Sequence, residues 1–392
     1  VAMEYIRFYE DRGLYVVKAE GQYVWDLNGL RYLDFHTGHG VAFLGHRNPR
    51  IIEALKRQME EVITAPLSFR VKIRDEMLQI LEKIFPDKYT HMAMFNSGSE
   101  GVEFAIKLVR KATGRKKLVA FTNSFHGRTL GALSITGNAR YRRPFEPLIP
   151  HVEIIQYNDV SSLDKIDGET AGVIVEVIQG EGGVIVANKE FIKALKERAN
   201  STGALIVIDE VQTGFGRTGK IWGFQHYSIE PDIIVAGKAI GGGFPVSIVA
   251  TSGILASNLE YGEHGSTFGG NPLACAAVKA SVEVFLEDNV LEKTESIGKI
   301  LYDKLYSTLG EHRLIREIRG LGLMLGVDLR INPSSVIKCL QDKRVLALRA
   351  GTTTIRLLPP YLITLEDVEW GVRALAQCLN EELSSRTTIR PS

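Results

Sequence analysis

The sequence predicts an α/β protein with a large, mostly parallel sheet, followed by a smaller α+β unit. Between residues 49 and 270, helical periods alternate with short apolar runs rich in β-branched residues, which is typical of strands covered by helices on both faces. After residue 270, two long helical stretches precede a series of short strands. A chain of 392 residues, 45% of them hydrophobic, can bury the large core that this plan requires.

The first segment, residues 1–48, contains an expected hairpin. Apolar and polar residues alternate over 15–34, and Asn28-Gly29 is a dipeptide typical of tight hairpin turns. We expect this segment to join the smaller unit.

The period of the apolar residues predicts the elements of the large unit, residues 49–270. The expected helices cover 49–62, 71–85, 99–113 and 188–201, and the expected strands cover 91–95, 117–121, 171–177, 204–209 and 231–236.

The smaller unit, residues 271–384, is expected to begin with helices and to continue with strands. The expected helices cover 271–287, 289–309 and 364–382, and the expected strands cover 313–319, 323–328, 345–348 and 354–358. The last residues, 385–392, read as a disordered tail.

Charge and cysteine content exclude several classes of protein. With 47 Lys+Arg against 46 Asp+Glu, the net charge is +1, so no global field favours nucleic acid or an anionic membrane. The three cysteines, Cys275, Cys339 and Cys378, lie far apart and show no metal-ligand spacing, which favours a reduced intracellular protein without a metal site. The longest apolar runs are too short to span a membrane, and the N-terminus has no apolar signal core. We therefore expect a cytoplasmic protein.

Two buried strands are expected to end in residues that carry chemistry. The run 204–208 leads into Asp209 and Glu210, which places carboxylates at the edge of the sheet where α/β proteins bind ligands. The run 231–236 leads to Lys238, whose amine would become nucleophilic if burial lowered its pKa. The simpler alternatives are that Asp209 caps a turn and that Lys238 extends to the surface.

Two further segments follow the expected strands 91–95 and 117–121. Residues 96–101 lead into a helix, so Gly98 and Ser99 could hold a phosphate at its N-terminus, or Ser97 could simply cap it. Residues 124–129 combine Phe125, His126 and Arg128, which suit a flat ring and a carboxylate. For His126 alone, a structural role is the simpler reading.

Two glycine-rich patterns at 214–220 resemble nucleotide motifs only in part. Gly214-Phe-Gly216-Arg-Thr-Gly219 matches GxGxxG but does not directly join a strand to a helix. Read as a P-loop, the same run has Ile221 where Ser or Thr is required after Lys220. Neither nucleotide binding nor nucleotide hydrolysis is therefore expected.

Taken together, the motifs resemble the class III, acetylornithine-type aminotransferases of fold type I. This resemblance implies a large domain with a mostly parallel, seven-stranded sheet, a smaller α+β domain, and pyridoxal 5′-phosphate (PLP) as the cofactor. The matching segments are Leu44-Gly45-His46, Asn96-Ser97-Gly98-Ser99-Glu100, Phe125-His126-Gly127-Arg128-Thr129, Gln179-Gly180-Glu181-Gly182-Gly183, Asp209-Glu210-Val211-Gln212-Thr213-Gly214, Gly237-Lys238, Ser266-Thr267-Phe268-Gly269-Gly270-Asn271-Pro272 and Ile355-Arg356-Leu357-Leu358-Pro359.

The resemblance assigns catalytic roles to two residues. Lys238 would hold PLP as a Schiff base and then move the proton at the substrate carbon, and Asp209 would keep the pyridine nitrogen protonated. The further residues expected to contact the cofactor are Gly98, Ser99, Phe125, Glu210, Val211, Gln212 and Thr267, with Gly98 and Ser99 at the phosphate, Phe125 on the ring face and Gln212 near the phenolic oxygen.

The resemblance also implies an assembly and a way to bind two substrates. Thr267 would reach the phosphate of the neighbouring subunit's cofactor, which implies a homodimer with shared active sites. Arg128, with Ser266 close by, would bind the carboxylate of one substrate. Arg356 would bind the α-carboxylate of glutamate or 2-oxoglutarate, and Glu181 could mask it.

Within the family, the sequence is similar to archaeal enzymes of lysine and arginine biosynthesis. These aminate a semialdehyde tethered to a small acidic amino-group carrier protein, which a cluster at Arg140, Arg142 and Arg143 could meet, although such clusters are commonly solvated faces. Free N-acetylornithine, ornithine or 4-aminobutyrate, a 2,1-aminomutase of the same fold, and a non-catalytic binding protein remain alternatives. The sequence does not choose between free and tethered substrates, or between the lysine and the ornithine branch.

Overall fold

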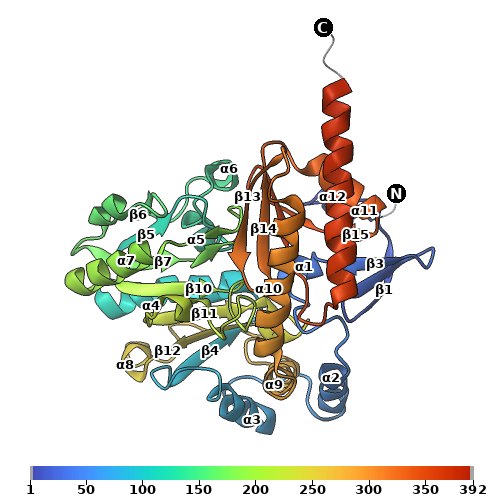
Figure 1. Ribbon diagram of the computed structural model, residues 1–392. Coiled ribbons are helices and arrows are strands. Elements are labelled where there is room, and N and C mark those ends of the chain that lie inside the picture. Colours follow the sequence, from blue (N-terminus) through green and yellow to red (C-terminus); the bar gives the residue numbers. More distant parts are fainter. Residues whose placement is uncertain (1–2, 389–392) are drawn as a thin grey trace.

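The centre of the molecule is a seven-stranded sheet (Figure 1), and the computed structural model describes residues 3–388. β12 is antiparallel to its neighbours β4 and β11, and the other neighbouring strands run parallel, so the predicted mostly parallel sheet is confirmed. In sheet order the strands are β4 (His91–Phe95), β12 (Ser247–Thr251), β11 (Ile233–Gly237), β10 (Leu205–Glu210), β7 (Thr170–Val175), β5 (Lys117–Phe121) and β6 (Val152–Ile155).

The sheet is covered on both faces because its strands are apolar on both faces. Along β10, Ile206 and Ile208 belong to one buried cluster and Val207 belongs to another. Helix α4 (Gly98–Thr113) supplies side chains to the second cluster, and α7 (Lys189–Thr202) and α9 (Pro272–Glu287) supply them to the first. Figure 1 labels these three helices around the sheet. This double burial explains why the strands read as unbroken apolar runs in the sequence.

Between residues 49 and 309, most helices agree with the predicted spans to within a few residues. α2 begins after Asn48, whose side chain accepts a hydrogen bond from Arg50 N, and α4 and α7 end at glycines with positive φ, Gly114 and Gly203. The helices here are α2 (Pro49–Glu61), α3 (Lys72–Leu81), α4 (Gly98–Thr113), α5 (Leu130–Ser134), α6 (Ala139–Arg142), α7 (Lys189–Thr202), α8 (Gly253–Ala256), α9 (Pro272–Glu287) and α10 (Val290–Leu309).

Three smaller sheets flank the central sheet. The expected hairpin is present and belongs to a sheet in the order β1-β2-β3-β15, in which Gly29 makes the turn with φ of 78°. The second sheet has the order β13-β14-β17-β16, and β8 pairs with β9 in the third. Their bounds are β1 (Val16–Glu20), β2 (Tyr23–Asp26), β3 (Arg31–Asp34), β8 (Ile178–Gln179), β9 (Ile185–Val186), β13 (Ile315–Leu321), β14 (Met324–Leu329), β15 (Val345–Leu346), β16 (Leu348–Ala350) and β17 (Thr354–Leu357).

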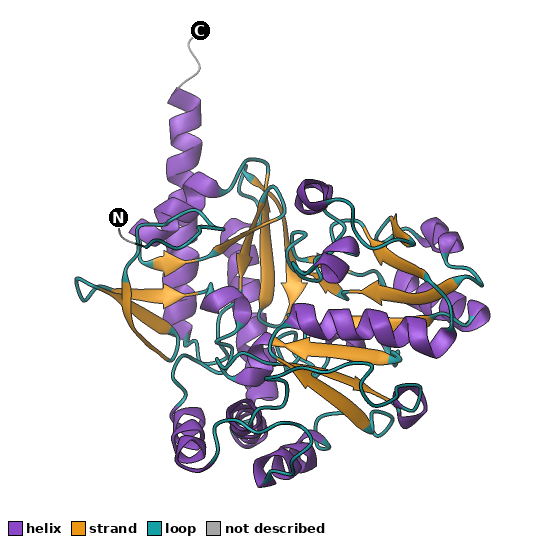
Figure 2. Ribbon diagram, turned by 180° about the vertical axis from the view of Figure 1, so that it is seen from behind, coloured by secondary structure: helices purple, strands orange, loops and turns teal. Residues whose placement is uncertain are grey.

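The C-terminal region differs from the prediction in two elements. A short helix, α11 (Ser334–Asp342), was not predicted, and the last helix, α12 (Leu365–Thr388), is longer than expected and extends away from the sheets (Figures 1 and 2). The predicted tail is therefore wrong over 385–388, while 389–392 lie outside the described residues. The domain boundaries at 48 and 270 remain predictions.

The expectation of fully reduced cysteines is wrong. Cys339 of α11 and Cys378 of α12 form a disulfide, and Cys275 is a buried free thiol. The two half-cystines are 39 residues apart, and only the packing of α11 against α12 brings them together. Among the residues that the structure describes, no helix is long and apolar enough to cross a bilayer.

The disulfide should contribute about 2–4 kcal/mol to the free energy of unfolding, because it closes a long loop in the unfolded chain. We expect the Cys339→Ala/Cys378→Ala variant to unfold at a lower guanidinium concentration than the wild type. A reducing agent should shift the wild-type midpoint towards that of the variant and leave the variant unchanged. Equal midpoints for the oxidised wild type and the variant would contradict this.

Candidate active site

A cavity of about 1630 Å³ lies at the carboxyl end of the central sheet. Lys238, Phe125, Arg128, Glu181 and Arg356 all line it, although they come from segments far apart in the chain. These side chains meet because their segments reach the carboxyl ends of the central strands, where the sequence predicted the site.

Lys238 lies on the cavity wall directly after β11, and not on the outer surface. Its backbone has φ of 45°, a left-handed conformation that a side chain rarely adopts and that is commonly found at functional positions. Burial lowers the pKa of the Lys238 amine to about 8, and the charge of Glu181 opposes this shift. Near neutral pH, a much larger fraction of this amine is therefore neutral and nucleophilic than of an ordinary lysine amine.

Asp209 is buried at the end of β10, behind the cavity wall. One carboxylate oxygen lies 2.8 Å from His126 Nδ1, and the other accepts a hydrogen bond from Val211 N. Burial alone would lower the pKa of His126, but the hydrogen bond and charge of Asp209 raise it overall. His126 thus fixes the orientation of the Asp209 carboxylate, while its own Nε2 is buried without a partner among the described residues.

Glu210, for which a cofactor contact remains a prediction, follows Asp209 at the end of β10. Successive residues of a strand point to opposite faces, so Glu210 faces away from Asp209. Its carboxylate accepts hydrogen bonds from Thr213 Oγ1, Gly223 N and Phe224 N, and burial raises its pKa to about 7. Its side chain therefore holds the loop that follows β10.

The N-terminus of α4 lies beside Val211. Ser97 caps the helix by accepting a hydrogen bond from Glu100 N, and a Cβ at Gly98 would lie 3.0 Å from Val211. The Ser99 hydroxyl accepts a hydrogen bond from Arg128 N, so it connects this helix end to the loop of Arg128. The capping role of Ser97 is compatible with an anion at this N-terminus.

Phe125 and Arg128 lie together on the cavity wall. Phe125 N donates to the buried Glu176 carboxyl group, whose pKa burial raises to about 8. The Arg128 guanidinium lies over the rings of Phe125 and Tyr141, at 5.2 and 4.3 Å. Stacking against these rings holds Arg128 in place while leaving its N–H groups free for a carboxylate.

Arg356 is fully buried on β17 and is paired with Glu181. Its two terminal nitrogens donate to Glu181 Oε1 at 2.8 Å and to Gln212 Oε1 at 2.9 Å, while its Nε has no partner among the described residues. Burial would raise the pKa of Glu181, but the charge of Arg356 lowers it overall. Gln212, which we predicted at the cofactor, thus contacts Arg356.

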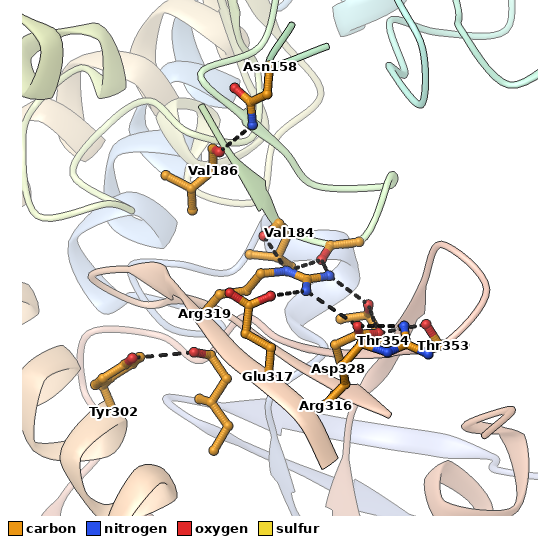
Figure 3. Close-up of polar contacts among 12 residues, drawn as sticks. Asn158, Val184, Val186, Tyr302, Arg316, Glu317, Arg319, Asp328, Thr353 and Thr354 are labelled. Carbon is orange, nitrogen blue, oxygen red and sulfur yellow. Dashed lines mark hydrogen bonds and ion pairs between the residues drawn. The ribbon is translucent and has the colours of Figure 1, made fainter. Parts of the chain in front are cut away.

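Arg319 holds the Glu181 loop against the sheet that carries Arg356 (Figure 3). Its guanidinium donates to Gly183 O and Val184 O, and it lies 3.5 Å from the Asp328 carboxylate on β14. The loop and the sheet are therefore held together by these contacts.

Arg217, from the glycine-rich run that resembled nucleotide motifs, joins three segments around the site. Its buried guanidinium donates to Gly40 O, Leu323 O and Pro359 O. These three acceptors are backbone carbonyl groups and not carboxylates. Burial lowers its pKa to about 9. Gly40 ends α1 (Thr37–Gly40), a segment in which all four residues have positive φ, and His39 of this segment lines the cavity.

Ser266 and Thr267 do not line the cavity of the described chain. The Ser266 hydroxyl accepts a hydrogen bond from Gly269 N, and Thr267 is exposed. Within the described chain, Ser266 is therefore not on the cavity wall beside Arg128. The sequence did not indicate the N-terminal segment 8–13, His36, His39, Tyr141 or α11 as cavity residues.

Comparisons with known proteins agree with this arrangement. The model of the family "Aminotransferase class-III" matches residues 8–379. The chain belongs to the class III aminotransferase family. It is 55% identical to the "[LysW]-aminoadipate semialdehyde/glutamate semialdehyde transaminase" of Sulfolobus acidocaldarius, over 96% of this chain and 97% of that protein. The protein of the same name from Sulfurisphaera tokodaii is also 55% identical, over 98% and 99% of the two chains.

Solved structures support the same fold. The ornithine aminotransferase of Toxoplasma gondii, described with partial occupancy of PLP at its active site, superposes with a TM-score of 0.93 at 31% identity. The superposition covers 97% of this aminotransferase and 93% of the parasite enzyme. The predictions of fold type I and of an aminotransferase are thereby confirmed.

The lowered pKa of Lys238 predicts how the cofactor-free protein should take up PLP. The neutral amine is the form that attacks an aldehyde, so the uptake rate should rise with pH around a midpoint near 8, well below that of an ordinary lysine. Stopped-flow absorbance would measure this rate. Lys238→Ala should abolish the covalent phase, whereas the exposed Lys220→Ala should retain it. A midpoint near 10.5 would contradict the burial argument.

Proposed function

We propose that this enzyme moves an amino group between glutamate and the terminal semialdehyde of a lysine or ornithine precursor attached to a carrier protein. The observation that carries the proposal is the juxtaposition of Lys238, the masked Arg356 and a cavity that extends well beyond them. The names of the relatives, which include a LysW-linked semialdehyde, agree with the function predicted from the sequence.

The residues of the site fit PLP, which was predicted as the cofactor and is named for the Toxoplasma structure. When bound, PLP supplies an electron sink for negative charge at the substrate carbon. Lys238 provides the amine that reacts with an aldehyde and that then carries a proton at the substrate carbon. Asp209, oriented by His126, can hold a proton on a ring nitrogen, and Phe125 offers an aromatic face.

Arg356 and Glu181 allow one site to accept two kinds of substrate. With the pair intact, the positive charge is neutralised and the site suits a substrate without a carboxylate at this position. When a dicarboxylate enters, its carboxylate can replace Glu181 as the partner of Arg356. The new charge-assisted hydrogen bond is then similar in strength to the Arg356–Glu181 bond that it replaces.

A homodimer with shared active sites is part of the proposal. Thr267 is exposed, and the large apolar side chains of Phe268, Leu67 and Phe69 beside it are 62%, 61% and 65% exposed. Arg74 Nε donates to Gly270 O, which keeps the two segments adjacent. An exposed apolar patch of this kind is typical of an interface.

We expect light scattering to show dimers of the wild type and a shift to monomers in the variant Phe268→Glu.

A cytoplasmic location also remains a prediction.

Substituting Glu181 tests the two-substrate switch. In Glu181→Gln, Arg356 stays charged without a carboxylate partner, so binding of the uncharged end of the semialdehyde should weaken. Because a hydrogen bond between charged groups is worth about 1.5–3 kcal/mol, kcat/KM for the semialdehyde should fall roughly tenfold or more. The KM for glutamate should not rise. Glu197→Gln, an exposed carboxylate of α7 that is not on the cavity wall, serves as the control. An equal loss with both substrates would show that Glu181 is not selective.

Steady-state rates with a carrier-linked and a free N-acetylated semialdehyde test the proposed substrate. We expect kcat/KM to be at least tenfold higher for the carrier-linked form, with glutamate as the amino donor. Equal values would identify a free-substrate aminotransferase, and turnover without any keto acid would identify an aminomutase.

A further inference from the structure

The outer part of the cavity carries a charge that the established chemistry of aminotransferases does not require. Seven lysine and arginine side chains line the cavity, against three acidic ones, in a chain whose overall net charge is only +1. Three of the seven, Lys238, Arg356 and Arg128, belong to the inner site described above. The surplus of positive charge is therefore concentrated on the outer wall.

The cationic groups of the outer wall come from three separate elements. Arg140 lies on α6, Lys338 on α11 and Arg349 on β16, and all three side chains are exposed. The Arg349 guanidinium donates to Gly351 O and Thr352 O, which orients it at the cavity. Within residues 3–388, none of the three forms an ion pair with a carboxylate, so their charges face the cavity without an acidic partner.

The acidic residues of the cavity do not compensate this charge. Glu181 is paired with Arg356, and Asp11 is paired with Arg7. Glu10 remains as the third acidic group of the wall. Arg12, beside it, adds a further cation, which is held by Gln341 Oε1 and Ala347 O.

The volume of the cavity points to a substrate that continues outward. At about 1630 Å³ it exceeds the roughly 300–1,000 Å³ of sites for free small molecules. A semialdehyde at Lys238 that is joined to a polypeptide must leave the site past the outer wall. Unpaired cations along that path are complementary to carboxylates on the polypeptide.

We propose that Arg140, Lys338 and Arg349 form an outer subsite that binds acidic side chains of the polypeptide to which the substrate is attached. This inference rests on the proposed function, because it requires a tethered substrate. Arg140 comes from the arginine cluster noted in the sequence, while Arg142 and Arg143 are not on the cavity wall. The subsite would recognise the carrier and not the reacting group.

Charge reversal tests the subsite. The variant Lys338→Glu/Arg349→Glu should lower the ratio of kcat/KM for carrier-linked over free N-acetylated semialdehyde by roughly tenfold, since two attractions become repulsions. Salt should weaken use of the carrier-linked substrate by the wild type, and do so less in the variant. Lys116→Glu, an exposed lysine that is not on the cavity wall, should leave the ratio within twofold of the wild type.

Two further measurements keep the outcomes distinct. A synthetic hexaglutamate peptide should inhibit turnover of the carrier-linked substrate by the wild type, and should inhibit the reversed variant several-fold less. The absorbance of bound PLP and circular dichroism should be the same in both proteins, which shows that the variant is folded and loaded.

The result that would overturn the subsite is a wild type that prefers the carrier-linked substrate together with a reversed variant that keeps the full preference. Competition by a single-stranded oligonucleotide as strong as that by hexaglutamate would also overturn it, because the wall would then attract any polyanion. A wild type without preference for the carrier-linked substrate would instead refute the proposed function.

Discussion

The arrangement of the site depends on a buried cation, Arg217, that is stabilised by hydrogen bonds to backbone carbonyl groups. The guanidinium of Arg217 donates to three carbonyl groups, and each belongs to a different segment of the cavity region. Because an unsatisfied buried charge is very costly, these segments are not free to separate. The ring of Phe43 lies 4.5 Å from the same guanidinium and closes the remaining side. The left-handed α1 segment and the end of β17 are thereby held at one position relative to the central sheet.

This fixed frame permits small movements of charge within the cavity. Arg356 is fully buried and keeps one partner, Gln212, while its other partner, Glu181, is about one quarter exposed and comes from a loop that Arg319 restrains. Glu176 and Lys238 have pKa values near 8, so each of them can gain or lose a proton at little cost near neutral pH. The site therefore combines a rigid backbone with side chains whose charge and partners can change, which suits a reaction with two different substrates in turn.

Much of the large sheet could be predicted because its strands are apolar on both faces and end in functional residues. Lys238 and Asp209 were identified in this way, and their roles at the cofactor remain predictions. The strand β12 and the helix α11 were missed, since one follows a glycine-rich run and the other is short and begins after Pro333. The hydrogen bonds of Glu210 with the following loop could not be predicted, because a motif does not say which face of a strand each residue occupies. The cavity wall formed by residues 8–13 and α11 depends on contacts over more than 300 residues, which no local pattern contains.

The cystine bridge ties the C-terminal helix to α11, which forms part of the cavity wall. Because Cys378 lies midway along α12, the bridge couples the position of Lys338 and Gln341 on α11 to the integrity of that helix. Gln341 also forms two hydrogen bonds with Arg12. The N-terminal segment 8–13 and the C-terminal helix α12 therefore both contact α11 and hold the same part of the cavity wall. Loss of either contact should therefore loosen the α11 side of the cavity wall without changing the segment that carries Lys238.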